Sequence, residues 1–213
     1  LMKTPYIAHL TEEDYEHVYE PAAEDSFILL DALEQDVDIF RDHPPSICVE
    51  IGSGSGVVST FLAQLLSEPA VHIATDINRY ACLATAKTGT INNVNLEVIQ
   101  SNLVDSFRLD GKIDILMFNP PYVPTSSEEL ASTQALRGIG GAWAGGETGM
   151  SITDEVIKSL QRLLAPGGRF YLVAVEQNRP LDIVEQLKDL GLDAEVVLRR
   201  RAGRELLYII RGI

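Results

Sequence analysis

Cationic side chains and cysteines are both scarce in this 213-residue sequence. Only 17 Lys and Arg oppose 31 Asp and Glu, which gives a formal net charge of −14. A protein that holds bare DNA or RNA by its phosphates needs clustered cations, so direct binding of free nucleic acid is not expected. Cys48 and Cys82 are too few for a disulfide scaffold or a four-thiolate zinc site. Such sparse cysteine usage predicts a reducing compartment, hence the cytoplasm or the nucleus.

Long apolar runs and metal-ligand spacings are missing as well. Ile113–Phe118, with one Asp inside it, is among the longest apolar runs. It is far shorter than the ~20 residues that cross a bilayer, so no membrane association is expected. The N-terminus has no basic-then-apolar signal pattern. The four histidines are scattered along the chain without ligand spacing, which predicts no metal site.

Charge is distributed unevenly along the chain. Residues 1–45 hold twelve acidic residues and two basic ones. The opposite end is basic and contains Arg199, Arg200, Arg201, Arg204 and Arg211. Two solvated surfaces are one interpretation. The other is that the arginines meet an anionic partner such as RNA.

What is present indicates one globular domain spanning residues 1–213, with residues 1–18 as an N-terminal extension. Apolar residues make up 46% and charged residues 23%, which is average for a folded protein. Periodicity predicts helices at 24–33, 57–66, 79–91, 151 to about 164, and 180–190. Strands are predicted at 46–51, 71–75, 96–99, 113–118 and 169–175, with a turn at 166–168 and a terminal hairpin of 194–200 and 205–210. Asp154 stands at a capping-box position for the helix that starts at Ser151.

Alternating strands and helices predict an α/β fold with a parallel sheet covered on both faces. The terminal hairpin adds antiparallel strands. The expected architecture is a seven-stranded, mostly parallel, Rossmann-like sheet with a C-terminal antiparallel hairpin. Residues 123–150 contain six glycines and are expected to form a long functional loop.

A glycine-rich loop, Glu50–Gly56, follows the first predicted strand and precedes a helix. Its spacing is Gly-x-Gly-x-Gly, so the dinucleotide fingerprint is not matched. Gly52 and Gly54 would let a ligand lie against bare backbone. Glu50 would repel a pyrophosphate but attract a cationic ligand end, and S-adenosylmethionine (SAM) carries a sulfonium and an ammonium. The alternative is a tight strand–helix turn without a ligand.

Asp76 ends the second predicted strand. A carboxylate there can accept hydrogen bonds from both hydroxyls of a ribose, as nucleoside cofactors require in this topology. Asn102 and Leu103 follow the third predicted strand. They would lie where an adenine amino group and ring face sit.

The most specific motif is Asn119-Pro120-Pro121-Tyr122, at the carboxyl end of the fourth predicted strand. Open α/β sheets bind ligands at that edge. The Asn119 side-chain oxygen and the Pro120 carbonyl can each accept one N–H of a planar amine, and Tyr122 offers a flat face. Hydrogen bonds to these acceptors strengthen as positive charge develops on the nitrogen of the amine, so they stabilise the transition state selectively. A proline-rich turn that merely closes the strand is the alternative.

These motifs resemble the class I SAM-dependent methyltransferases that modify planar amines. Tyr19-Glu20-Pro21, Glu24–Phe27 and Ala142–Gly146 narrow the resemblance to the eukaryotic and archaeal branch of the HemK-like release-factor glutamine methyltransferases. It covers roughly residues 15–212. Unlike the bacterial branch, the chain is expected to have no separate N-terminal helical domain.

The resemblance implies a substrate, a partner and a set of site residues. The substrate is the glutamine of the Gly-Gly-Gln tripeptide in a translation termination factor, methylated on its side-chain nitrogen. The partner is a small zinc-binding activator subunit that extends the sheet beside the third strand, here Leu96–Ile99. The implied cofactor contacts are Ser26, Glu50, Gly52, Gly54, Asp76, Asn102, Leu103 and Asn119, and Asn119, Pro120 and Tyr122 would hold the glutamine amide.

The chain departs from the family pattern at two places. Ala22-Ala23 inserts one residue between Tyr19 and Ser26, and Asn102 stands where the family often has Asp. Asn can still accept the adenine amino hydrogen.

Three other functions fit parts of the sequence. N6-methylation of adenine in DNA or RNA would use the same acceptor site, although the charge of −14 opposes it. Methylation of a protein lysine would need a base to deprotonate the ammonium, and none is evident. A non-catalytic scaffold would have no physical need for the Asn-Pro-Pro-Tyr acceptors.

Overall fold

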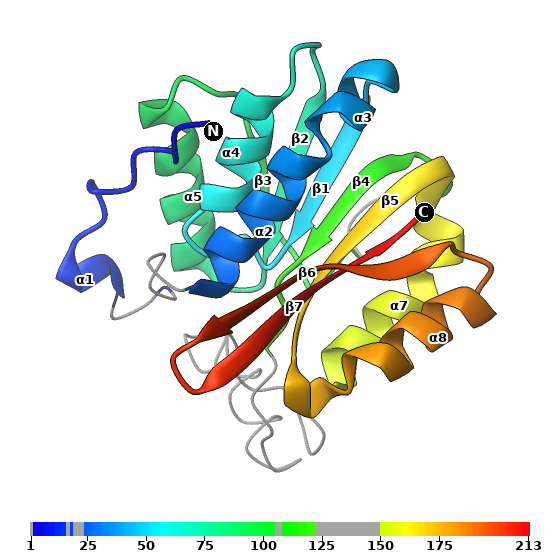
Figure 1. The fold of residues 1–213 in the computed structure, drawn as a ribbon. Helices are drawn as coiled ribbons and strands as arrows, with labels where there is room; N and C mark the ends of the chain where they lie inside the picture. The colour runs from blue at the N-terminus through cyan, green and yellow to red at the C-terminus, as the bar shows by residue number, and fades with distance from the viewer. Residues whose placement is uncertain (1, 16–17, 19–23, 105–107, 122–149) are drawn as a thin grey trace.

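The computed structural model describes residues 2–15, 18, 24–104, 108–121 and 150–213. Their centre is one seven-stranded sheet with the order β3-β2-β1-β4-β5-β7-β6 (Figure 1). The strands are β1 (Ile47–Ile51), β2 (Val71–Asp76), β3 (Glu97–Gln100), β4 (Ile113–Phe118), β5 (Leu164–Val175), β6 (Ala194–Ala202) and β7 (Glu205–Gly212). The first five are parallel, whereas β7 runs antiparallel to both β5 and β6. The predicted mostly parallel sheet with a terminal hairpin is therefore confirmed.

Helices cover both faces of the sheet (Figure 1). They are α1 (Glu12–Tyr15), α2 (Glu24–Gln35), α3 (Val37–Asp42), α4 (Val57–Leu65), α5 (Arg79–Ile91), α7 (Ser151–Leu163) and α8 (Pro180–Asp189), with a short 3-10 helix, η2 (Glu176–Asn178). One core cluster joins α2, α3 and α4 to the sheet, and the other joins α7 and α8 to its opposite face. Because β4 and the second half of β5 are covered on both faces, Ile115–Phe118 and Phe170–Val175 are continuous apolar runs rather than alternating patterns.

The sequence placed most elements correctly but misjudged several ends. The helix that starts at Glu24 continues to Gln35, and α1 and α3 were not predicted. The third strand begins one residue later than expected, because pairing with β2 begins at Glu97 while Leu96 packs against Gly89 of α5. The terminal strands extend two residues further than predicted, to Ala202 and Gly212.

Two local predictions near α7 were wrong. Pro166-Gly167-Gly168 does not form the turn predicted before the fifth strand: β5 runs through it and pairs with β4 on both sides, at Leu164 and at Arg169, with a register shift between. The capping box at Asp154 is also not formed. Met150 takes the cap position because its carbonyl accepts the first helical bond, from the Asp154 N–H at 2.8 Å, and it contributes no side-chain cap.

The N-terminal segment packs against α5. The side chain of Asn92 exchanges two hydrogen bonds with the Tyr6 backbone, accepting from its N–H at 2.7 Å and donating to its carbonyl at 2.8 Å. Further along, Leu10 and Val18 are buried against Ala81 and Ala84 of α5. The segment therefore leads along α5 toward the beginning of α2.

The acidic and basic ends of the sequence meet in space. Arg200 of β6 pairs with Asp31 of α2, and Arg211 of β7 binds both carboxylate oxygens of Asp36 at 2.7 Å. The buried Tyr171 hydroxyl donates to the same Asp36 carboxylate at 2.6 Å. Part of the uneven charge thus joins the terminal hairpin to the α2–α3 side of the sheet, an arrangement that neither earlier interpretation included.

Among the described residues, no helix is both long and apolar enough to cross a membrane.

Candidate active site

The predicted site residues gather at one edge of the sheet. β1 ends in register with both of its neighbours, because Ile51 pairs with Thr75 of β2 and with Phe118 of β4. The residues that follow, Gly52, Asp76 and Asn119, therefore lie at the carboxyl ends of three adjacent parallel strands. This is where open α/β sheets bind their ligands.

Three glycines with left-handed backbone shape the loop after β1, and they do different things. Gly52 has a φ of 69° and Gly54 a φ of 52°, and a Cβ on either would meet no atom within 4 Å. Open space therefore lies over this part of the backbone. At Gly56, with a φ of 78°, a Cβ would come within 2.7 Å of the Thr85 Cα. The third glycine lets α5 pack against the loop, so it is structural.

Asp76 organises the loop as well as ending β2. Its Oδ2 accepts from the Gly54 N–H at 3.0 Å and its Oδ1 from the Asn78 N–H at 2.8 Å. Burial raises the pKa of Asp76, and the backbone N–H groups around it oppose that rise. The carboxylate thus holds the glycine loop in place beside the position where a ribose was predicted.

Glu50 is buried beneath the loop, with 3% of its surface exposed. Its Oε2 accepts from the backbone N–H of Ser59 at 2.9 Å and from the Ser59 hydroxyl. Ser59 is the third residue of α4, and the cap residue Gly56 has no side chain to satisfy these first N–H groups. Glu50 therefore caps α4 from the neighbouring strand. Its role toward a cofactor stays a prediction.

The environment of Glu50 also changes its acidity. Burial raises the pKa of this carboxyl to about 8, and the bonds from Ser59 only partly oppose that effect. Asp76 adds a smaller increase through its negative charge. A cationic ligand end near this edge would stabilise the ionised form.

Asn119 has a hydrogen-bond acceptor that is unsatisfied among the described residues. Its Oδ1 atom is buried and has no hydrogen-bond partner there. A buried acceptor without a donor costs roughly 1–3 kcal/mol, so a native structure that keeps one calls for an explanation. A planar N–H group entering at this edge would satisfy it. Pro120 is buried beside it, and Tyr122 lies outside the described residues.

The remaining predicted contacts are placed less closely. Ser26 is buried in the first turn of α2, which begins at the same edge because its other end leads through α3 to the start of β1. Leu103, just after β3, has a φ of 48°, which is uncommon for a side chain of its size. Asn102 before it is exposed. The motifs Tyr19–Pro21 and Ala142–Gly146 lie outside the described residues.

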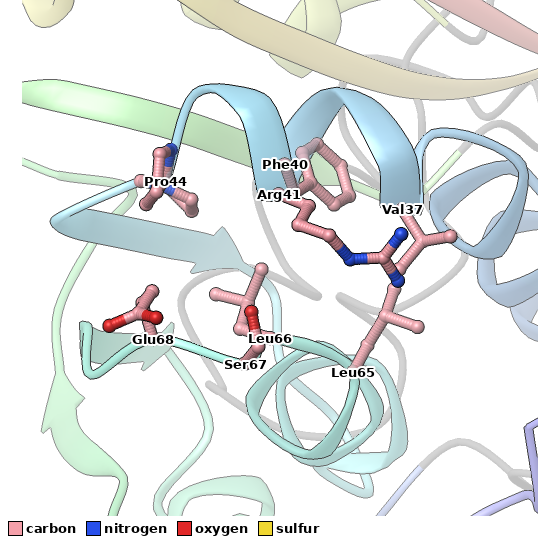
Figure 2. A pocket seen from close by; sticks show the side chains of 9 residues that line it. Val37, Phe40, Arg41, Pro44, Leu65, Leu66, Ser67 and Glu68 are labelled. Carbon is pink, nitrogen blue, oxygen red and sulfur yellow. The ribbon is translucent and has the colours of Figure 1, made fainter.

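A shallow hollow lies at the opposite, amino edge of the sheet (Figure 2). It is lined by α3, by Pro44 and Pro45, and by the chain from Leu65 to Glu68. Arg41, on its rim, is already paired with Asp38 at 2.5 Å. None of the predicted site residues lines it. The described residues also contain no group of three or more His, Cys, Asp or Glu that could hold a metal.

Three features together define a class I SAM-dependent methyltransferase. They are the strand order, the glycine loop with open space above it, and the acidic end of β2. The residues present fit SAM: two glycines leave room for it, Asp76 ends β2, where a ribose was predicted, and the Oδ1 of Asn119 has no donor among the described residues.

Comparison with known proteins agrees with this class. The sequence profile of the Methyltransferase small domain family matches residues 24–137. The chain is 43% identical to mouse "Methyltransferase HEMK2", over 98% of this chain and 95% of the mouse protein. It is 41% identical to the Schizosaccharomyces pombe "eRF1 methyltransferase catalytic subunit mtq2", over 99% of this chain and 95% of that protein.

A solved structure gives the same result. It is the E. cuniculi Mtq2–Trm112 complex, which is responsible for methylation of the eRF1 translation termination factor. One of its chains is 25% identical to this one and superposes on it with a TM-score of 0.68. The match covers 92% of this chain and 97% of that chain. The protein therefore belongs to the Methyltransferase small domain family, in the HemK-like branch of HEMK2 and Mtq2, as the sequence motifs predicted.

Proposed function

We propose that this chain transfers the methyl group of SAM to the side-chain amide nitrogen of the glutamine in the Gly-Gly-Gln tripeptide of a translation termination factor. The observation that carries the proposal is the buried Oδ1 of Asn119, which has no donor among the described residues. A primary amide supplies the N–H that this acceptor lacks. The substrates named for the S. pombe and E. cuniculi relatives support the same choice.

The chemistry asks the protein to hold and polarise a poor nucleophile. An amide nitrogen has a delocalised lone pair, so it attacks only when it is held in line with the methyl group and its developing positive charge is compensated. SAM supplies an activated methyl on a sulfonium when it is bound. The Asn119 oxygen would accept one N–H, with the Pro120 carbonyl as the second acceptor. Both interactions strengthen as charge develops on nitrogen, so they favour the transition state over the ground state.

The cofactor would lie across the carboxyl ends of β1 and β2. Gly52 and Gly54 leave the space, Asp76 would accept from the ribose hydroxyls, and Asn102 and Leu103 would flank the adenine. Glu50 and Ser26 would lie near the cationic end. Tyr122 is proposed to stack on the target amide.

We also propose a heterodimer with a small zinc-binding activator subunit that adds a strand to β3. Within the described chain, β3 pairs only with β2, which leaves its other edge open. Beside it, α5 exposes 54% of Tyr80 and 57% of Leu83. An open edge next to apolar side chains is an aggregation hazard unless another chain covers it. The complex solved for the E. cuniculi relative supports this partner.

Adenine N6-methylation is the second candidate, because the exocyclic amine of adenine offers the same planar N–H donors to Asn119. The net charge of −14 disfavours it.

A termination factor as substrate would place the reaction in the cytoplasm.

The test is site mapping on a defined substrate. A purified termination factor is incubated with this chain, the activator and SAM, and its mass and modified residue are determined. The proposal expects one added methyl group on the Gly-Gly-Gln glutamine, and none when that glutamine is replaced by alanine. Methylation of an adenine-containing oligonucleotide in preference to the factor would support the second candidate instead.

A further inference from the structure

The tip of the β6–β7 hairpin projects past the catalytic edge of the sheet. The last pair between β7 and β5 joins Leu207 to Val175, the final residue of β5. β6 and β7 continue to pair beyond it, up to Ala202 and Glu205. Two further residues of strand extend the hairpin by roughly 7 Å. Because β5 is parallel to β4, the hairpin tip stands at the carboxyl edge of the sheet (Figure 1), and Asn119 directly follows β4 at that edge.

The tip is basic in a protein that is otherwise strongly acidic. Residues 199–205 carry four arginines and one glutamate, against a net charge of −14 for the whole chain. Arg200 turns toward α2 and is neutralised by Asp31. Arg199 stacks over the Tyr208 ring, with its guanidinium carbon 5.6 Å from the ring centre. Arg201 and Arg204 are exposed and have no ion pair within the described part of the chain.

Strand alternation determines the direction in which these cations face. Arg200 points to the α2 side of the sheet, so Arg199 and Arg201 point to the other side, the face covered by α7 and α8. Arg204 lies at the turn itself. Three cations thus face outward at the rim of the catalytic edge, while the opposite face of the hairpin is anchored by an ion pair. An anchored strand pair presents its charges with little loss of conformational freedom on binding.

We infer that the hairpin tip, through Arg201 and Arg204 with Arg199 beside them, is a docking site for an acidic surface of the protein substrate. The inference rests on the proposed function and adds to it a second point of contact for the folded factor. A few local cations suit a short acidic segment, whereas a nucleic acid would need many phosphate contacts against a repulsive net charge. Charge complementarity at a rim mainly accelerates encounter and aids selection of the partner.

The experiment compares two variants that change the net charge equally. Arg201→Glu/Arg204→Glu reverses two charges at the tip. The control, Lys112→Glu/Lys158→Glu, reverses two exposed cations elsewhere, one before β4 at the opposite edge and one on α7. Each chain, in complex with the activator, is assayed on the folded termination factor and on a short peptide that contains Gly-Gly-Gln. SAM affinity is measured alongside.

The tip variant is expected to raise KM for the folded factor about tenfold, with kcat within about twofold and SAM affinity unchanged. Its KM should also depend less on salt than that of the wild type. Activity on the peptide and all activities of the control should stay near wild type. Equal effects in both variants, equal loss on the peptide, or an effect that requires added RNA would overturn the inference. Failure of the wild type to methylate the factor would overturn the proposed function as well, so the two failures are distinguishable.

Discussion

At the scale of single residues, Asp76 and Asn119 lie at the ends of β2 and β4, the two strands that flank β1, but they differ in their hydrogen bonding. Asp76 already accepts two backbone N–H groups, whereas the Oδ1 of Asn119 accepts none from the described chain. Asp76 is therefore part of the frame of the site even before a ligand arrives. Within the described chain, the Asn119 Oδ1 has no donor, so a ligand could supply one. Substitutions at the two positions should have different kinetic consequences.

Replacement of Asn119 by alanine should slow methyl transfer without much loss of cofactor. A hydrogen-bond acceptor that acts mainly in the transition state raises the rate more than the affinity. The analogous removal of one oxyanion-hole donor lowers kcat by roughly 10²–10³. We expect a rate loss of about 100-fold or more, with SAM affinity within several-fold. Single-turnover kinetics and calorimetry give the two numbers. Turnover near that of the wild type would remove Asn119 from this role.

Replacement of Asp76 by alanine should weaken SAM binding. The loss of a charged acceptor to two ribose hydroxyls costs about 1.5–3 kcal/mol. Asp76→Asn is the matched control, because its remaining oxygen can still accept from Gly54 or Asn78 and hold the loop. If the loop contacts alone mattered, Asn would bind SAM as the wild type does. We expect calorimetry to show weaker binding for both variants, with alanine the weaker.

Glu50 should make the stability of the protein depend on pH. Burial raises its pKa from 4.5 to about 8 in the folded state, so the folded protein binds more protons than the unfolded chain between these values. Its contribution is therefore fully present below about pH 4.5 and is lost as pH rises through about 8. Relative to Glu50→Gln, which stays neutral, the wild type should lose free energy of unfolding from pH 5 to 8.5. Urea titrations at several pH values measure this difference, and a difference that is constant with pH would contradict the assignment.

At the scale of elements, the glycine loop packs closely against α5 at Gly56. Gly56→Ala would put a Cβ within 2.7 Å of the Thr85 Cα, at a φ of 78°. We expect a loss of about 2–3 kcal/mol in free energy of unfolding, since both backbone strain and a backbone clash oppose the change. Gly203→Ala is the control, because its φ of 57° brings the strain without any atom within 4 Å. It should cost about 1 kcal/mol. Equal losses in denaturant titrations would mean that the contact with α5 contributes nothing.

The sequence was informative about elements wherever local patterns decide the structure. The strands and the helices between them follow from apolar periodicity, and α5 and β4 lie at the predicted residues. The capping of α4 by Glu50 could not be predicted, because it depends on a side chain nine residues away, on the other side of the glycine loop. Likewise, the bond between Tyr171 and Asp36 joins residues 135 positions apart. The roles assigned to Ser26, Asn102 and Leu103 stay predictions.

At the scale of the whole molecule, the charge pattern separates into three parts. Arg200 and Arg211 join the hairpin to Asp31 and Asp36, so part of the basic end serves the fold. The cations at the hairpin tip stay exposed at the catalytic rim. The remaining acidic surface gives the chain its net charge of −14. In the proposed docking, a few local cations would select the substrate, while the net charge of the chain repels polyanions.

The proposed activator would cover the edge of β3 that is open within the described chain. Ser101, just after β3, donates its N–H to the Asp76 carbonyl at 3.0 Å, so residues at alternate positions before it also face β2. Val98 lies between those positions, and its N–H faces the open edge. Val98→Pro would therefore remove a donor available to an added strand while sparing the ladder to β2.

We expect Val98→Pro to lose co-purification with the activator and to aggregate, whereas Val98→Ala, which keeps the N–H, should bind it. The reason is that an added strand gains its affinity mainly from main-chain hydrogen bonds at the edge. The leucine before β3 is a poor site for this test, because Leu96 packs on Gly89 of α5 and its loss would disturb the fold itself. Co-purification with light scattering measures both properties. A Val98→Pro chain that still forms the complex, or a wild-type chain that is monomeric, soluble and fully active without the activator, would show that β3 is not the docking edge.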